Sequence, residues 1–202
     1  MTKLLELKNI SKTFPGVKAL QNVNLDLEAG EVLGLCGENG AGKSTLMKIL
    51  TGIYTADPGG QIWLEGKQVT VGGVAHAREL GLSIIHQELN MVPDLTVAQN
   101  LYLGRPGSHK SGWINDSKLN HEAAKLFERL GMNLDPTARI GDLSVARQQM
   151  VEIARALSYN SRILVMDEPT AALTVGETEA LFGMIRDFVT PSTGLIYISH
   201  RM

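Results

Sequence analysis

The residues with the clearest chemical meaning are Gly37, Gly42, Lys43 and Ser44, which follow the spacing G-x-x-x-x-G-K-[ST]. Glycines let several backbone N–H groups approach an anion without obstruction by side chains. The lysine adds a positive charge, and the serine hydroxyl suits Mg²⁺. We therefore predict that this loop binds a triphosphate, with Lys43 at the β- and γ-phosphates. The alternative is a glycine-rich turn with an incidental lysine.

A strand and a helix must position this loop. The apolar run 32–36 predicts a buried strand, and Leu46, Ile49 and Leu50 recur at the spacing of a helix that Gly52 closes. The positive end of that helix would face the bound phosphates. The strand–loop–helix setting is the context that the motif requires.

A second group of polar residues follows other apolar runs. Asp167 and Glu168 end the run 163–166, which places two carboxylates at the carboxyl edge of a parallel sheet. Asp167 would hold Mg²⁺ through its water shell, and Glu168 would orient and deprotonate the attacking water. The alternative is a solvated acidic pair in a turn. Gln87 and His200 also follow apolar strands, so the same edge would collect them, although each taken alone fits a surface polar residue.

Composition narrows the class of protein. The 202 residues are 44% hydrophobic, which suits one domain with a sub-lobe or two small domains. A net charge of -2, from 19 basic and 21 acidic residues, disfavours nucleic acid as a partner. No apolar run approaches the roughly 18 residues of a membrane span, so any membrane role would be peripheral. The start MTKLLELKNI is typical of an edge strand, not of a signal peptide. The single cysteine, Cys36, fits a reducing cytoplasm and is expected to be a small core residue instead of a reactive thiol.

The chain divides into three stretches by pattern. Residues 1–87 are expected to form an antiparallel β lobe and the phosphate-loop core, with strands at 5–7, 23–27 and 61–66. Residues 88–150 are expected to form a helical lobe, and 151–202 the rest of the core.

Helix signals are strongest in the second and third stretches. Thr96 precedes a short helix, and Asp116 or Ser117 would cap a longer one that Gly131 ends. A further helix follows Ser144. Thr174 and Glu177 fit a capping box for the last helix, and 195–199 is expected to be the last strand.

The order of these motifs resembles the ATP-binding cassette (ABC) ATPases over all 202 residues. The resembling motifs are the phosphate loop 37–45, a glutamine loop at Gln87, a signature at Leu143-Ser144, the run Asp167-Glu168-Pro169-Thr170 and a switch histidine at His200. The resemblance implies an α/β, RecA-like phosphate-loop core with an N-terminal antiparallel β lobe and an inserted helical lobe, in one ABC ATPase domain over 1–202.

The resemblance also implies roles for individual residues. Glu168, Gln87 and His200 would act in catalysis, and Ser44, Gln87 and Asp167 would hold Mg²⁺. Phe14 would stack on adenine, with core packing as its alternative. ATP would otherwise be bound by the signature serine Ser144 and by the loop residues Gly37, Glu38, Asn39, Gly40, Ala41, Gly42, Lys43, Ser44 and Thr45.

More narrowly, the chain resembles the first cassette of double-cassette ATPases of bacterial monosaccharide importers in four segments, KTFPGVKAL, GENGAGKSTLMKILTG, HQELNMVPDLTVAQNLYLG and YISHRM. The resemblance implies a membrane permease, a sugar-binding protein and a second cassette as partners, at the cytoplasmic face of the bacterial inner membrane. The chain would then be a truncated first cassette. The resemblance implies that ATP lies between two cassettes, with the signature of one facing the phosphate loop of the other. Val145 and Ala146 stand where this signature usually has two glycines, so this chain is expected to be a poor partner for the facing phosphate loop. Thr174 stands where many members have aspartate, and both departures are ones that sugar-importer ATPases tolerate.

Two other classes remain possible on the sequence. A soluble ABC ATPase acting on ribosomes or DNA shares these motifs, although its repair and chromosome type inserts a long coiled coil before the signature. A phosphate-loop kinase would pass the phosphoryl group to an acceptor, and it needs neither Glu168 beside Asp167 nor Ser144 at a helix start.

Overall fold

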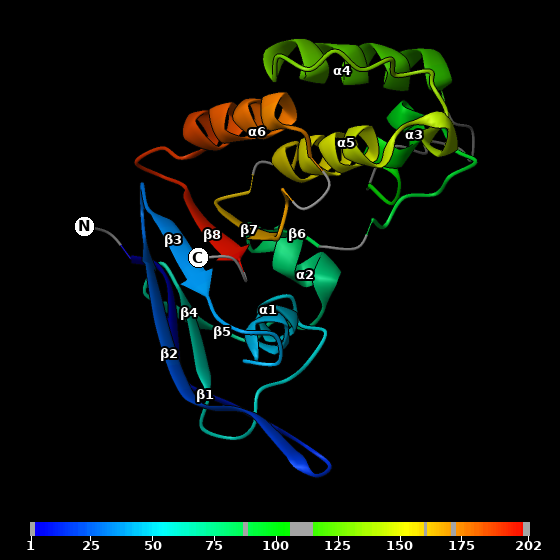
Figure 1. Cartoon of the computed structure of the whole chain (residues 1–202). Coiled ribbons are helices and arrows are strands. Elements are labelled where there is room, and N and C mark those ends of the chain that lie inside the picture. The colour runs from blue at the N-terminus through cyan, green and yellow to red at the C-terminus, as the bar shows by residue number, and fades with distance from the viewer. Residues whose placement is uncertain (1–2, 87–88, 106–114, 160, 171–172, 200–202) are drawn as a thin grey trace. The chain divides into compact units, whose positions relative to one another are not determined.

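The computed structural model describes residues 3–86, 89–105, 115–159, 161–170 and 173–199 (Figure 1). The chain forms two compact units. The first, called the core unit below, comprises 1–87, 159–168 and 185–202, and the second, the helical unit, comprises 88–158 and 169–184. By contacts, the helical unit thus extends beyond the segment 88–150 that its sequence pattern outlines.

An antiparallel sheet of four strands opens the core unit. Its order is β2-β1-β4-β5. The strands are β1 (Lys3–Phe14), β2 (Val17–Glu28), β4 (Gln61–Leu64) and β5 (Lys67–Val69). The predicted β lobe is confirmed, but the prediction that the chain starts as an edge strand is wrong, because β1 pairs with both β2 and β4. The alternation of Leu5 and Leu7 with Glu6 and Lys8 reflects one buried and one exposed face of an inner strand.

A parallel sheet carries the phosphate loop. Its order is β3-β8-β7-β6, and every described pairing within it is parallel. The strands are β3 (Val32–Cys36), β6 (Leu82–Ile85), β7 (Ile163–Asp167) and β8 (Gly194–Ser199), and the unit's short helices are α1 (Lys43–Leu50) and α2 (Val74–Glu79). Leucine, isoleucine and valine side chains from both sheets and α1 form one core cluster. The predicted parallel core is therefore confirmed.

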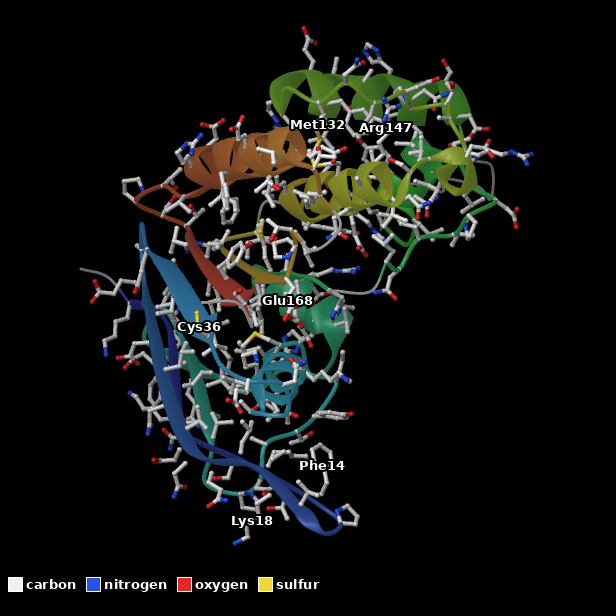
Figure 2. The ribbon with its side chains drawn as sticks, viewed as in Figure 1. Phe14, Lys18, Cys36, Met132, Arg147 and Glu168 are labelled. Carbon is white, nitrogen blue, oxygen red and sulfur yellow. The ribbon has the colours of Figure 1, made fainter. Side chains whose placement is uncertain are left out.

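The position of Cys36 differs from the expected one. Its side chain is exposed at the end of β3, which is an edge strand with alternating exposure, so the expectation of a small core residue is wrong (Figure 2). The run 32–36 is apolar in sequence, but only alternate residues face the core.

The helical unit packs around its own apolar cluster. Its elements are α3 (Val97–Tyr102), α4 (Asp116–Arg129), a 3₁₀ turn at Ile140–Asp142, α5 (Val145–Leu157) and the first ten residues of α6 (Val175–Phe188). Thr96 and Gln99 form a capping box at α3. Asn115, and not Asp116 or Ser117, caps α4, because its side chain accepts from the N–H of Lys118. Sequence alone could not choose among three consecutive capping types.

None of the described helices is both long enough and apolar enough to cross a lipid bilayer.

Candidate nucleotide-binding site

The phosphate loop leaves β3 and enters α1 through two glycines with left-handed backbone. Gly40 has φ 86° and Gly42, the N-cap of α1, has φ 90°, a region that side-chain-bearing residues rarely adopt. The N–H of Leu46 donates to the carbonyl of Gly42, so the helix is regular from its first turn. The first N–H groups of a helix have no acceptor within the helix, and they are the natural donors to an anion.

Lys43 curls back over its own loop. Its Nζ donates to the carbonyl oxygens of Gly37, at 2.5 Å, and Glu38, at 2.9 Å. Two carbonyl acceptors thus hold the ammonium group above the loop. The positive charge of Lys43 is thus fixed beside the N-terminus of α1. The charge and the positive end of the helix both favour a bound phosphate.

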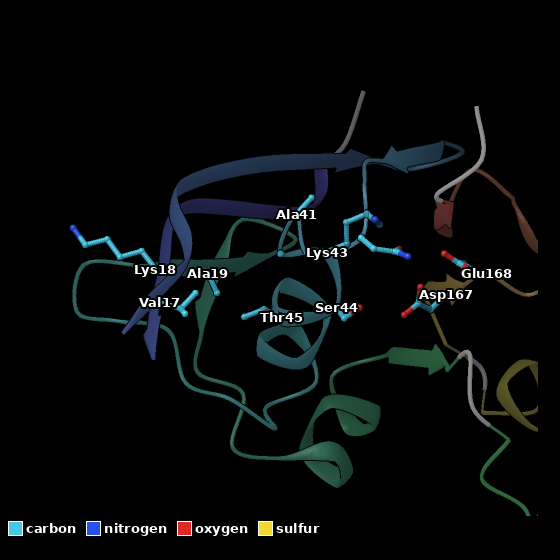
Figure 3. A pocket seen from close by; sticks show the side chains of 12 residues that line it. Val17, Lys18, Ala19, Ala41, Lys43, Ser44, Thr45, Asp167 and Glu168 are labelled. Atoms are coloured by element: carbon cyan, nitrogen blue, oxygen red, sulfur yellow. The ribbon is translucent and has the colours of Figure 1, made fainter. Parts of the chain in front are cut away.

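A cavity of about 230 Å³ opens at this loop, and all of its lining belongs to the core unit. Its lining residues are Val17, Lys18, Ala19, Asn39, Gly40, Ala41, Gly42, Lys43, Ser44, Thr45, Asp167 and Glu168. Figure 3 shows the side chains of Lys43 and Ser44 on one side and those of Asp167 and Glu168 on the other, pointing toward a common space. A cation, a hydroxyl and two carboxylates therefore meet where the sequence predicted a triphosphate and Mg²⁺.

The two carboxylates are fixed by sheet pairing. Asp167 is the last residue of β7 and pairs with Ile198 of β8. The N–H of Glu168 donates to the carbonyl of Ile198 at 3.1 Å, which extends that pairing by one residue. Glu168 has φ 49°, an uncommon backbone conformation for a residue with a side chain. Strained residues of this kind concentrate at functional sites.

Burial and neighbouring charges shift the pKa of Asp167. Burial raises the pKa of Asp167, and the negative charge of Glu168 raises it further, whereas His86 and Lys43 lower it. Asp167 is thus a carboxylate that a nearby cation would stabilise.

We expect Asp167→Asn to stabilise the nucleotide-free chain at neutral pH. A carboxyl whose folded pKa lies above its unfolded value costs no stability at acid pH, where both states are protonated. Its cost appears as the pH rises from the unfolded value of 3.8 through the folded pKa, and the asparagine variant lacks that loss. Urea midpoints between about pH 4 and pH 7 measure the difference. Asp187→Asn, which removes an exposed carboxylate from α6, is the control. Parallel pH curves for Asp167→Asn and wild type would contradict the expectation.

Gly42 tolerates no side chain. A Cβ there would lie 2.6 Å from the carbonyl oxygen of Ala19 and 2.7 Å from Leu20 Cδ2. We expect Gly42→Ala to destabilise the chain by about 1 to 3 kcal/mol and to weaken nucleotide binding. Gly40→Ala is a matched control, because Gly40 also has positive φ but nothing lies within 4 Å of its added Cβ. Denaturation and nucleotide titration of both variants test this expectation. Equal effects in the two variants would show that the positive φ, and not the clash with Ala19 and Leu20, causes the loss.

The other predicted nucleotide contacts divide into three groups. Gly37 and Glu38 hold Lys43 without lining the cavity. Phe14 packs edge-on against Tyr54, with ring centroids 5.3 Å apart, and it does not line the cavity either, so stacking on adenine stays a prediction (Figure 2). Gln87 and His200 lie outside the described residues.

Ser144 belongs to the helical unit. Its side chain caps α5 by accepting from the N–H of Arg147 at 3.3 Å. Val145, the next residue, is 57% exposed. The signature serine thus opens a helix, as its pattern predicted.

Sequence reasoning missed one wall of the cavity. Val17, Lys18 and Ala19 at the start of β2 line it, and in Figure 3 the Lys18 side chain points away from the loop. Nothing in their types signals a site, because the β1–β2 pairing brings them there. Among the described residues, no three or more His, Cys, Asp or Glu side chains gather as a metal cluster.

Comparison with known proteins defines the class. The family model "ABC transporter" matches residues 20–171. Two solved structures of ATP-binding cassettes from ABC transporters agree in fold. One, in its ADP conformation, has a TM-score of 0.82 at 29% identity and covers 100% of this chain and 83% of its own. The other, which is nucleotide-free, has a TM-score of 0.84 at 29% identity, and the match covers 98% of this chain and 82% of that structure's chain. The chain therefore belongs to the ABC transporter family and carries its nucleotide-binding domain.

Two curated relatives are more similar in sequence. The protein from Albidiferax ferrireducens is 54% identical over 100% of this chain, and the one from Geobacillus kaustophilus is 50% identical over 98%. Both carry the name of a ribose/galactose/methyl galactoside import ATP-binding protein. This chain spans 40% of the length of each.

Proposed function

We propose that the chain is an ATP-hydrolysing cassette that powers import of a monosaccharide through a membrane permease. The cavity that brings Lys43 and Ser44 opposite Asp167 and Glu168 carries the proposal. The names of relatives at 50% to 54% identity support the sugar-import part.

The donor set fits MgATP. A hydroxyl from Ser44 and a carboxylate from Asp167 are the hard oxygen ligands that Mg²⁺ prefers, and Gln87 is the third proposed ligand. Bound there, Mg²⁺ would neutralise charge on the β- and γ-phosphates. Lys43 and the backbone N–H groups of the loop, including those of Glu38, Asn39 and Thr45, would hold the phosphate tail, while Phe14 would hold adenine.

Glu168 would act as the general base. Its carboxylate accepts a proton from water as the water oxygen attacks the γ-phosphorus, and the bond to the β–γ bridging oxygen breaks to leave ADP. In this proposal His200 and Gln87 position the water and the γ-phosphate.

The partners follow from the same proposal. Ser144 would face the phosphate loop of a second cassette, and the permease would connect the pair to a sugar-binding protein. This arrangement places the chain at the cytoplasmic face of the bacterial inner membrane, with no nucleic acid involved.

The test starts with the chain alone. We expect it to bind MgATP, to release phosphate slowly and to remain largely monomeric. Alone, the chain can pair only with another copy, whose Val145 and Ala146 would stand where two glycines normally approach the γ-phosphate. A lost backbone donor of that type costs roughly 2.7 to 4 kcal/mol of transition-state stabilisation. Phosphate found on an acceptor molecule, instead of free in solution, would indicate a kinase. A steep second-order rise of rate with protein concentration would show that two copies of this signature suffice.

The import part needs the partners. In proteoliposomes that hold the permease, the second cassette and the sugar-binding protein, ribose or galactose should raise phosphate release and enter with it. ATP hydrolysis that no sugar stimulates would contradict the import proposal while leaving the ATPase assignment intact.

A further inference from the structure

Glu152 is a buried carboxylate in the helical unit that takes no part in the proposed nucleotide binding or hydrolysis. It lies in α5, the residue is only 8% exposed, and its Oε1 accepts from the backbone N–H of Asn90 at 3.2 Å. Its Oε2 has no hydrogen-bond partner among the described residues. A buried carboxylate with one unpaired oxygen lowers the stability of the fold relative to an apolar residue of similar size. Its presence in α5 therefore suggests a role other than stability.

The surroundings of Glu152 are consistent with an anchor. Burial raises the pKa of this carboxyl, and the Asn90 N–H and the charge of Arg155 lower it. The Asn90 contact joins residues 62 positions apart, so it ties two segments of the unit together. Asn90 is three residues after Gln87, the proposed ligand of Mg²⁺.

The chain after Asn90 is held by other contacts that begin further along. Asn100 is fully buried, and its side chain accepts from the N–H of Val92 at 2.8 Å and donates to the carbonyl of Val92 at 3.1 Å. Backbone bonds then join 93–97 to 138–141, the stretch that leads into Ser144. The carbonyl of Pro93, for example, accepts from the N–H of Gly141 at 3.0 Å.

These contacts differ in how close they come to Gln87. On the side of the chain after Gln87, the backbone bonds to 138–141 reach back to Pro93, the Asn100 contacts reach back to Val92, and the Glu152 bond reaches back to Asn90. Glu152 lies eight residues after Ser144 on the same helix, a distance of about 12 Å along a rigid axis. A displacement of α5 would therefore carry Ser144 and the backbone at Asn90 together.

We propose that Glu152 is a positioning residue that ties the segment following Gln87 to the helix that starts at Ser144, so that both move as one piece. The proposal rests on the proposed function for the roles of Gln87 and Ser144. Glu152 touches no nucleotide in this scheme and acts through the backbone of Asn90.

Three variants test the proposal. Glu152→Leu removes the acceptor, Glu152→Gln keeps an oxygen that accepts from Asn90, and Gln149→Leu is the matched control. Gln149 lies on the same helix and is 5% exposed, and its Nε2 has no partner among the described residues. Both leucine variants therefore bury an apolar side chain in α5, and only one removes the anchor.

Amide hydrogen exchange measures the anchor directly. We expect the Asn90 amide to exchange about tenfold faster in Glu152→Leu, because a buried acceptor is lost, and at the wild-type rate in the other two variants. Unchanged exchange in Glu152→Leu would overturn the proposal whatever the wild-type ATPase rate.

Steady-state kinetics test the positioning role. We expect Glu152→Leu to lower kcat for ATP about tenfold with MgATP affinity unchanged, because the phosphate loop is untouched, and Glu152→Gln to restore kcat. Equal kcat in Glu152→Leu and Gln149→Leu would reduce Glu152 to a packing residue. Absence of hydrolysis in the wild type would instead overturn the proposed function, and the exchange experiment would still decide whether the anchor exists.

Discussion

Glu168→Gln is expected to lower ATP turnover by at least about 100-fold while MgATP binding stays nearly intact. A positioned general base supplies a factor of about 10² to 10⁴, and an amide cannot accept the proton of the attacking water. The substitution keeps the size of the side chain and the backbone bond from residue 168 to Ile198. Phosphate release and nucleotide titration on the same preparation measure the two quantities.

A second variant at this position separates chemistry from strain. Gly adopts positive φ without penalty, so Glu168→Gly should unfold at a higher denaturant concentration than Glu168→Gln, because it relieves the conformation at φ 49°. Both variants should hydrolyse ATP at the same low rate, because both lack the carboxylate. A near wild-type rate in Glu168→Gln, measured with the partners that give the wild type its full rate, would remove Glu168 from the role of base.

Features that depend on a few neighbouring residues could be predicted from the sequence. The phosphate loop, the strand ending at Asp167 and the capping box of Thr174 and Glu177 are local, because each needs only residue types at fixed spacing. The structure brings Lys43, Ser44, Asp167 and Glu168 into one cavity as that spacing predicted. A parallel sheet collects the ends of its strands at one edge, so local pattern and site geometry agree here.

Features that depend on distant pairing could not be predicted. Cys36 is exposed because β3 is an edge strand, and β1 is an inner strand because β4 returns to pair with it. The Glu152–Asn90 bond joins residues 62 positions apart, and no sequence period encodes it. Similarly, Val17, Lys18 and Ala19 reach the cavity only through the β1–β2 pairing. Each of these facts is set by which strands or helices become neighbours, which residue type alone does not specify.

Lys43→Ala is expected to weaken MgATP binding by about two orders of magnitude, because hydrogen bonds to charged groups contribute about 1.5 to 3 kcal/mol and the phosphate tail would lose its fixed cation. The structure adds a second cause. Lys43 Nζ bridges the carbonyls of Gly37 and Glu38, so its loss also frees the loop whose N–H groups must be ordered on binding.

Lys48→Ala supplies the matched control for Lys43→Ala. Lys48 lies on the same helix α1, and its ammonium lies 5.6 Å from the centre of the Tyr54 ring and does not line the cavity. Both variants remove one positive charge from the same helix, so a general electrostatic effect would weaken binding equally in both. Isothermal titration with MgATP distinguishes the cases: a large loss confined to Lys43→Ala supports direct contact with phosphate. Wild-type affinity in Lys43→Ala would contradict the assignment of the loop itself, because every other proposed role in this cavity depends on phosphates bound there.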